Sequence, residues 1–231
     1  MTEGPGFHNR EHHIILTIRS LLTSLINEPS EYDKIVPVIE YWIEYVLREQ
    51  FTTTDELVEG ISRMAWDQGG SYVDVGRFLK EFRDAPHRSE QARSFVDKLC
   101  EHVLRWFAIA SVQSLPMDLG RTAGPLSVAI HGGRGFIRAA SFVGRLIEQD
   151  LLSHELVRRH LVKPLITHHY TSSNSIREAI RVEAIYQLFV SAGNILLCGF
   201  LEPEDMQISF DTLDAHAGAN TVLDAGKLQV R

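Results

Sequence analysis

The sequence predicts an all-α protein of stacked antiparallel helical hairpins, a HEAT-like α-solenoid of about four to five repeats. Apolar residues recur along most of the chain at the three- and four-residue spacing of amphipathic helices. Short breaks rich in Gly, Pro, Ser and Thr separate these stripes, so that helix pairs of roughly 40 residues are expected. No strong two-residue alternation predicts a sheet. An irregular helical bundle fits the same periodicity, and periodicity alone favours the solenoid only slightly.

The first two expected helices lie in the first 50 residues. The first runs from Glu11 to Ile26. Its apolar stripe consists of Ile14, Ile15, Ile18, Leu21, Leu22 and Leu25. A break around Pro29 follows, and Ser30 with Asp33 has the spacing of a capping box that opens the second helix.

The next three helices are delimited by capping residues and by glycine or proline. Thr53 and Glu56 form a capping box for the third helix, which the Gly69-Gly70 pair ends. A fourth helix closes before Pro86, and Ser89 is expected to cap the fifth.

The second half of the chain begins with a loop of about a dozen residues at 114–125. We expect a sixth helix after Gly132-Gly133, a seventh capped by Ser153 and kinked or ended by Pro164, and an eighth opened by Ser175. After Gly199 the pattern fades, apart from one short helix. The expected organisation is therefore a flexible N-terminus at 1–10, a helical-repeat domain at 11–199 and a partly ordered tail at 200–231.

Composition and charge limit the classes of function. The chain has 231 residues and a net charge of -7, which divides into -7 for residues 1–120, +5 for 121–181 and -5 for 182–231. Such an acidic protein is a poor general nucleic-acid binder, although the basic stretch could touch RNA. Two cysteines, no apolar run long enough for a membrane span and no secretory signal predict a reduced, cytoplasmic location without membrane attachment.

No pattern indicates catalysis. The sequence has no Gly-x-Ser-x-Gly and no phosphate-binding loop, and its carboxylates are scattered over the polar helix faces. The spacing of its histidines does not match a metal site, because adjacent histidines on a helix point about 100° apart. We therefore expect no enzyme activity, no cofactor, no metal and no small-molecule substrate.

Four helical segments resemble the middle domain of eukaryotic translation initiation factor 4G, a family of HEAT-like helical repeats. They are Ile18-Arg19-Ser20-Leu21-Leu22 with Tyr32-Asp33-Lys34-Ile35, Phe95-Val96-Asp97-Lys98-Leu99, Phe136-Ile137-Arg138-Ala139-Ala140-Ser141-Phe142-Val143-Gly144, and Val182-Glu183-Ala184-Ile185-Tyr186. The likeness spans residues 12–197 and rests on helix faces and spacing. Gly144 is informative, because a glycine inside a helix costs ~1 kcal/mol against alanine and predicts a closely packed neighbouring helix.

The resemblance implies a scaffold for a partner protein. In that family the partner is the DEAD-box helicase initiation factor 4A, so the resemblance implies that the first hairpin binds one helicase lobe and the last repeats bind the other. The corresponding partner-binding residues of the first hairpin are Leu25, Asn27, Glu28 and Tyr32. Arg145 stands where the family has a glutamate, and the last repeat is vestigial, so this divergent or shortened member is expected to couple weakly to the helicase.

Two alternatives stay open. The first is an RNA-binding module that uses a basic face. Its residues would be Arg134, Arg138, Arg145, Arg158, Arg159, Lys163, Arg177 and Arg181. The second is a specialised regulator of translation or mRNA fate that has kept the fold without the helicase.

Overall fold

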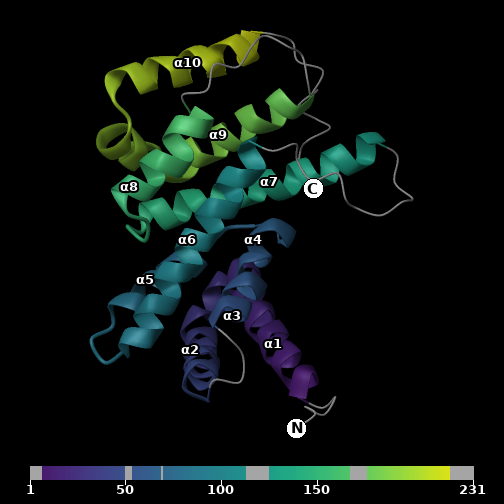
Figure 1. The fold of residues 1–231 in the computed structure, drawn as a ribbon, viewed down its shortest axis with the longest axis vertical. Helices are drawn as coiled ribbons and strands as arrows, with labels where there is room; N and C mark the ends of the chain where they lie inside the picture. Colours follow the sequence, from purple (N-terminus) through teal and green to yellow (C-terminus); the bar gives the residue numbers. More distant parts are fainter. Residues whose placement is uncertain (1–6, 50–53, 69, 113–124, 167–175, 219–231) are drawn as a thin grey trace. The chain divides into compact units, whose positions relative to one another are not determined.

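The structure is a computed structural model that describes residues 7–49, 54–68, 70–112, 125–166 and 176–218. Every regular element within these ranges is a helix, and no strand occurs in them. The predicted all-α class is therefore confirmed. The chain forms two compact units (Figure 1). The N-terminal unit comprises residues 1–103 and 149–151, and the C-terminal unit comprises residues 104–148 and 152–231.

The N-terminal unit is built from helices whose apolar stripes were visible in the sequence. Its elements are α1 (Phe7–Asn27), the 3-10 turn η1 (Pro29–Glu31), α2 (Tyr32–Glu49), α3 (Thr54–Ser62), α4 (Met64–Asp67), α5 (Val73–Asp84) and α6 (Glu90–Val112), which continues into the other unit. On α1 the buried side chains include Ile18, Leu22 and Leu25, as the stripe predicts. Ser89 caps α6, because its hydroxyl accepts a hydrogen bond from the Ala92 amide at 3.2 Å.

Two details of this unit correct the sequence prediction. Ser30 does not cap the second helix, because it lies inside η1, which runs directly into α2. The expected third helix is divided into α3 and α4 at Arg63. The Thr53 hydroxyl that was expected to cap α3 lies outside the described residues.

The C-terminal unit contains α7 (Pro125–Glu148), α8 (His154–Val157), the π-helix η2 (Arg158–Ile166), α9 (Ile176–Ile195), the π-helix η3 (Leu196–Phe200) and α10 (Pro203–Gly218). Ser153 caps α8 as expected, and its hydroxyl accepts from the Leu156 amide at 3.4 Å. Pro164 lies within η2. Proline disrupts the hydrogen-bond pairing of an α-helix, and the wider turn of a π-helix pairs the backbone groups differently. Ser175, the expected cap of α9, lies outside the described residues.

The expected start of the sixth helix after Gly132-Gly133 is wrong. Helix α7 already begins at Pro125, a residue type suited to the first helical position, and the two glycines lie inside it. Packing explains Gly133, because a Cβ atom there would come within 2.4 Å of the Ile180 side chain on α9.

Gly144 confirms the close approach predicted for it. A Cβ atom on Gly144 would lie 2.5 Å from the Cβ atom of Ser191 on α9. Gly133 and Gly144 on α7 thus face Ile180 and Ser191 on α9 in the same order along the chain. The two helices therefore run parallel, and Figure 1 draws them side by side.

The N-terminal unit also contains pairs of parallel helices. Ile15 of α1 adjoins Gly60 of α3, and the Arg19 guanidinium binds Asp67 of α4 at 2.9 Å. Near the start of α2, the Tyr32 hydroxyl donates a hydrogen bond to Glu81 of α5, and near its end the Leu47 carbonyl accepts one from Gln91 at the start of α6. The hydrogen-bonded partners in these pairs are 44 to 49 residues apart.

The segment Ile180–Phe200 is long and apolar enough to cross a membrane by length and composition, and a third of its apolar window is buried. It packs against α7 through Ile180 and Ser191.

Candidate functional site

Two turns that connect helices lie next to each other in the N-terminal unit, one between α1 and α2 and one between α4 and α5. The contact is made at Gly70, where a Cβ atom would fall 2.4 Å from the Ile26 side chain. Gly70 also has φ +132°, a backbone conformation that residues other than glycine rarely adopt. We call five exposed residues in and beside these turns the turn edge; they are Asn27, Glu28, Asp33, Asp67 and Ser71, and Pro29, Ser30, Lys34 and Gly70 are exposed next to them.

Within the predicted partner-binding set, the structure separates exposed from buried residues. Asn27 and Glu28 are exposed at the turn, whereas Leu25 and Tyr32 are 0% and 7% exposed. Leu25 is part of the core. Tyr32 joins α2 to α5, because its hydroxyl donates a hydrogen bond to Oε2 of Glu81 at 2.6 Å. These two buried residues hold the turn in place, and Asn27 and Glu28 are the members of the set that are accessible to solvent.

The Arg77 cation reinforces the bond between Tyr32 and Glu81. The Arg77 guanidinium lies 4.3 Å from the centre of the Tyr32 ring and donates from Nε to Oε1 of Glu81 at 2.8 Å. Burial raises the pKa of the Tyr32 hydroxyl, and the Glu81 carboxylate raises it further. Burial alone would raise the pKa of Glu81, but hydrogen bonds from Tyr32 and Arg77 outweigh it and lower that pKa. Glu81 therefore stays ionised beside a neutral phenol.

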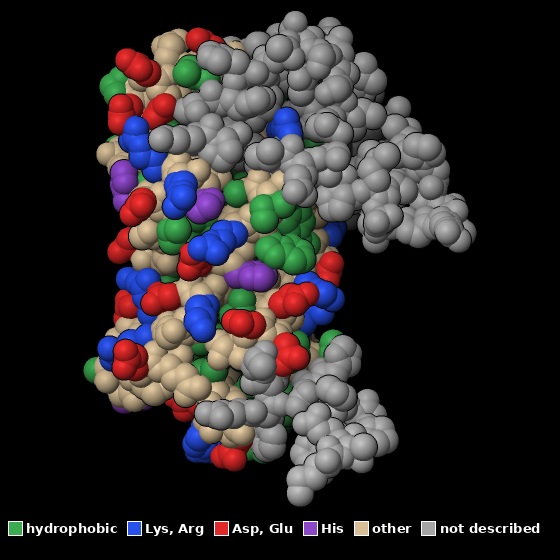
Figure 2. All heavy atoms as spheres, in the orientation of Figure 1, with side chains coloured by type: hydrophobic (Ala, Val, Ile, Leu, Met, Phe, Trp, Pro, Cys, Tyr) green, Lys and Arg blue, Asp and Glu red, His purple; other side chains and the backbone are tan. Residues whose placement is uncertain are grey.

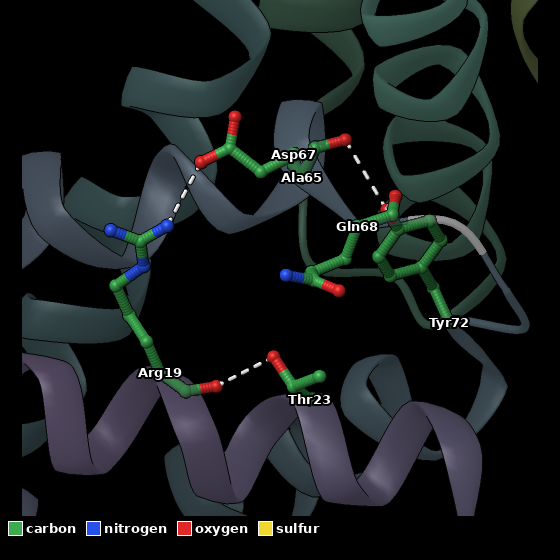
Figure 3. A network of polar contacts seen from close by, with 6 residues as sticks. All are labelled: Arg19, Thr23, Ala65, Asp67, Gln68 and Tyr72. Atoms are coloured by element: carbon green, nitrogen blue, oxygen red, sulfur yellow. Dashed lines mark hydrogen bonds and ion pairs between the residues drawn. The ribbon is translucent and has the colours of Figure 1, made fainter.

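The other turn is fixed by the polar network in Figure 3. From α1, the Arg19 guanidinium points to the Asp67 carboxylate, with 2.9 Å between the nitrogen and the oxygen. The Tyr72 hydroxyl donates to the Gln68 carbonyl at 2.5 Å and lies 3.2 Å from the Ala65 carbonyl. Because Tyr72 is buried, its hydroxyl satisfies backbone oxygens that the end of α4 leaves free. Both turns are thus held at fixed positions.

The turn edge carries three carboxylates, and the exposed cation Lys34 lies beside Asp33. Glu28 and Asp33 are exposed, and Asp67 is paired with Arg19 while 57% of its side chain remains exposed. Residues 1–120, which include the edge, have a net charge of -7. An acidic surface attracts basic protein surfaces and repels phosphate. Among the described residues, no cluster of three His, Cys, Asp or Glu side chains could hold a metal ion.

Two arginines of the predicted basic face contact carboxylates. Arg145 at the end of α7 binds Glu148 at 2.7 Å and reaches the Ser191 carbonyl at 3.4 Å. Arg158 at the start of η2 binds Glu202, just before α10, at 2.5 Å. These contacts belong to different helix pairs, and each reduces the positive charge offered to a phosphate.

The remaining members of that set lie on three helical segments. Arg134 and Arg138 are half-buried on α7, Arg159 is exposed on η2, and Arg181 is half-buried on α9. The side chains of Lys163 and Arg177 lie outside those the structure describes. Figure 2 shows one face of the molecule, on which the described Lys and Arg side chains are interspersed with Asp and Glu.

Sequence reasoning missed the residues that brace the turns, above all Arg77, Glu81 and Arg19. The four-residue spacing of Arg77 and Glu81 indicates a helical ion pair, but the contact with Tyr32 spans 49 residues and leaves no local signal. No family model matches the chain, and neither the curated proteins nor the solved structures contain a match to it.

Proposed function

We propose that the chain is a non-catalytic scaffold of stacked two-helix repeats, which binds a DEAD-box helicase of the initiation factor 4A type through the turn edge. Support for the stack comes from one repeated observation. In each unit, contacts between parallel helices join residues separated by a nearly constant interval. Arg19 with Asp67 and Tyr32 with Glu81 are 48 and 49 residues apart, and Arg145 with Ser191 is 46 apart. The close approaches of Gly133 to Ile180 and of Gly144 to Ser191 also join α7 to α9 at this interval.

This interval is what a stack of two-helix repeats requires. Each repeat contributes one helix to each of two layers, so the like helices of successive repeats are parallel and one repeat length apart. We assign α1 with α2, α3–α4 with α5, α6 with α7, and α8–η2 with α9 as four successive repeats. Helix α10 would begin a fifth repeat; just before it, Glu202 binds Arg158 of η2 from 44 residues away.

The turn edge is the surface on which this scaffold would bind the helicase. Both turns connect the two layers, so a stack brings such turns together along one side. Their exposed carboxylates suit a basic patch on the helicase, and the bracing by Tyr32 and Arg19 holds them rigid before binding. A rigid scaffold that contacts one arrangement of a two-lobed enzyme better than another shifts the enzyme toward that arrangement.

The experiment that tests the proposal is a titration of the full chain with purified helicase, read as binding affinity and as stimulation of its ATPase. The double charge reversal Glu28→Lys with Asp33→Lys should weaken binding by at least about tenfold, because two attractive contacts become repulsive. Asp97→Lys on α6 is the matched control, since it reverses an exposed carboxylate outside the turn edge and should leave the affinity unchanged.

Two outcomes would overturn the proposal. Absence of helicase binding by the unaltered chain would refute the partner, and equal binding by the double reversal would refute the turn edge. A parallel titration with single-stranded RNA at two salt concentrations identifies the competing function. Tight RNA binding that falls steeply with salt, together with no helicase binding, would make the chain an RNA-binding module.

A further inference from the structure

Helix α9 has apolar side chains on two opposite sides. The inner side packs against α7 through Ile180 and Ser191, and Leu188 on that side is 0% exposed. On the outer side, positions 182, 186, 189 and 190 have the spacing of a single helix face. We call the apolar residues there, with a neighbouring phenylalanine of α10, the outer face of α9; they are Val182, Tyr186, Phe189, Val190 and Phe210.

The outer face of α9 is a contiguous apolar surface that solvent reaches. Tyr186, Val190 and Phe210 are 52%, 57% and 47% exposed. The Phe189 ring stacks on the Phe210 ring, with centroids 6.4 Å apart, which joins α10 to the apolar stripe of α9. Single exposed apolar residues are common on proteins, whereas a contiguous patch marks an interaction surface.

Carboxylates border the outer face of α9 on both helices. Glu183 lies beside the stripe on α9, and Asp211 is exposed next to Phe210 on α10. Glu183 accepts a hydrogen bond from the Gln187 amide at 3.0 Å, and Asp211 accepts one from the Gln207 amide at 2.7 Å. These donors are neutral, so neither hydrogen bond cancels the negative charge of its carboxylate.

The sequence of α9 and α10 around this face adds further negative charge. Residues 182–218 contain six Asp or Glu and no Lys or Arg. One of the six, Glu202, is paired with Arg158. Arg181 is nine positions before Val190, which places the two on opposite sides of α9. The outer face of α9 is therefore an apolar stripe with acidic borders.

The charge of these borders selects the kind of partner. An anionic membrane or a nucleic acid would bring its phosphates next to carboxylates, which opposes binding. Two copies of the face packed on each other would bring acidic borders together. A helix with an apolar stripe flanked by Lys or Arg satisfies both features, because its stripe covers the rings and its cations meet the carboxylates.

We propose that the outer face of α9 binds a basic amphipathic helix of a partner protein. Tyr186 and Val190 contact the apolar stripe of that helix, and Glu183 and Asp211 contact its flanking cations. The proposal goes beyond the helicase contact at the turn edge, which lies in the N-terminal unit, and does not depend on it. One helix gives a small interface, so we expect a dissociation constant on the order of 10 µM.

A model peptide titrated into the full chain tests the proposal. The probe is a fluorescently labelled peptide of about 18 residues, with Leu at three- and four-residue spacing and Lys at the other positions, and its anisotropy reports binding. A scrambled peptide of the same composition keeps the charge but has no apolar face. A third peptide has Glu in place of each Lys. Both should bind at least about tenfold more weakly than the Lys peptide.

Val190→Asp tests the apolar centre of the face. It should weaken binding of the Lys peptide by more than about tenfold, because it places a charge inside the apolar contact. An association driven by charge alone would instead become tighter. Val38→Asp on α2 is the matched control, since Val38 is 43% exposed and lies outside this face, and it should leave the affinity unchanged. Far-UV circular dichroism verifies that each variant is folded.

The acidic borders are tested by the double variant Glu183→Gln with Asp211→Asn. It should bind the Lys peptide at least about fivefold more weakly and with a smaller dependence on salt. Glu49→Gln with Asp97→Asn removes two exposed carboxylates elsewhere and should leave the affinity unchanged.

Any of the following results would overturn the proposal. Equal binding of the Lys peptide and its scrambled form, or undiminished binding by Val190→Asp, would show that the outer face of α9 is not the site. A dimer of the unaltered chain in sedimentation equilibrium that Val190→Asp dissociates would assign the face to a second copy. Binding to phosphatidylserine vesicles that Val190→Asp abolishes would assign it to a membrane surface.

Discussion

Replacing Gly144 by alanine tests the packing that joins α7 to α9. In a free helix this change would stabilise by about 1 kcal/mol, because alanine has the highest helix propensity. In this chain the new Cβ atom would lie 2.5 Å from the Cβ atom of Ser191, whereas carbon atoms in contact prefer about 3.5–4.0 Å. The nearest atom is a Cβ fixed to the backbone of α9, so no side-chain rotation relieves the overlap.

The two helices must therefore separate by about 1 Å around this point, and overpacking of this kind costs about 1–3 kcal/mol. After the gain in helix propensity is subtracted, Gly144→Ala should destabilise the chain by about 1 kcal/mol, within a range of about 0–2. Urea unfolding followed by far-UV circular dichroism measures this difference as a lower midpoint at unchanged slope.

Gly193→Ala on α9 is the matched control. A Cβ atom there would meet only the Phe189 side chain, at 3.8 and 3.9 Å, which is ordinary contact. This variant should be as stable as the unaltered chain or up to about 1 kcal/mol more stable. Adding Ser191→Gly to Gly144→Ala removes the opposing Cβ atom, so the pair should show a favourable coupling energy. A raised midpoint for Gly144→Ala alone would refute the reasoning.

Three further predictions concern the N-terminal unit and the thiols. Arg88→Ala should lower the free energy of unfolding by about 2 kcal/mol, since it leaves two carboxylates of α2 without their shared cation. Tyr32→Phe should destabilise the chain more above about pH 5 than at more acid pH, because the lowered pKa of Glu81 contributes stability above its unfolded value of 4.5 that is lost as pH falls through the folded value. Acid titrations of both chains measure this difference, and a pH-independent difference would contradict it. Burial raises the pKa of the Cys100 thiol to about 12. Ellman's reagent should therefore label the exposed Cys198 quickly and Cys100 only after unfolding. A fast labelling phase that remains in the Cys198→Ser variant would disprove this.

Helices were predictable from the sequence because their signal is local. The apolar stripe of α1 and the caps at Ser89 and Ser153 depend on residues within a few turns of each other. The close approach at Gly144 was also predictable, since a glycine inside a regular apolar stripe needs a packing reason. Another glycine led to the wrong start for α7. Gly133 was interpreted as marking the start of the helix, but it lies inside α7 at a position of close packing.

The candidate site was predictable only in outline. Asn27 and Glu28 were expected at the first turn and are exposed there. That Tyr32 is buried against Glu81 could not be foreseen, because periodicity indicates that a side chain is buried but not which segment covers it. Gly70 had been interpreted only as a helix end, whereas its contact with Ile26 brings the two turns together. Contacts across 48 and 49 residues need the folded chain before they can be recognised.

Hydrogen–deuterium exchange of the full chain with and without saturating helicase tests the scaffold account most directly. The account predicts new protection at Asn27–Asp33 and at Ser71–Asp74, with α7 and η2 unchanged, because the two turns are the proposed binding surface. Protection confined to the arginine-bearing segments Arg134–Arg145 and Arg158–Ile166, or no change in any peptide under conditions where the helicase is bound, would contradict it.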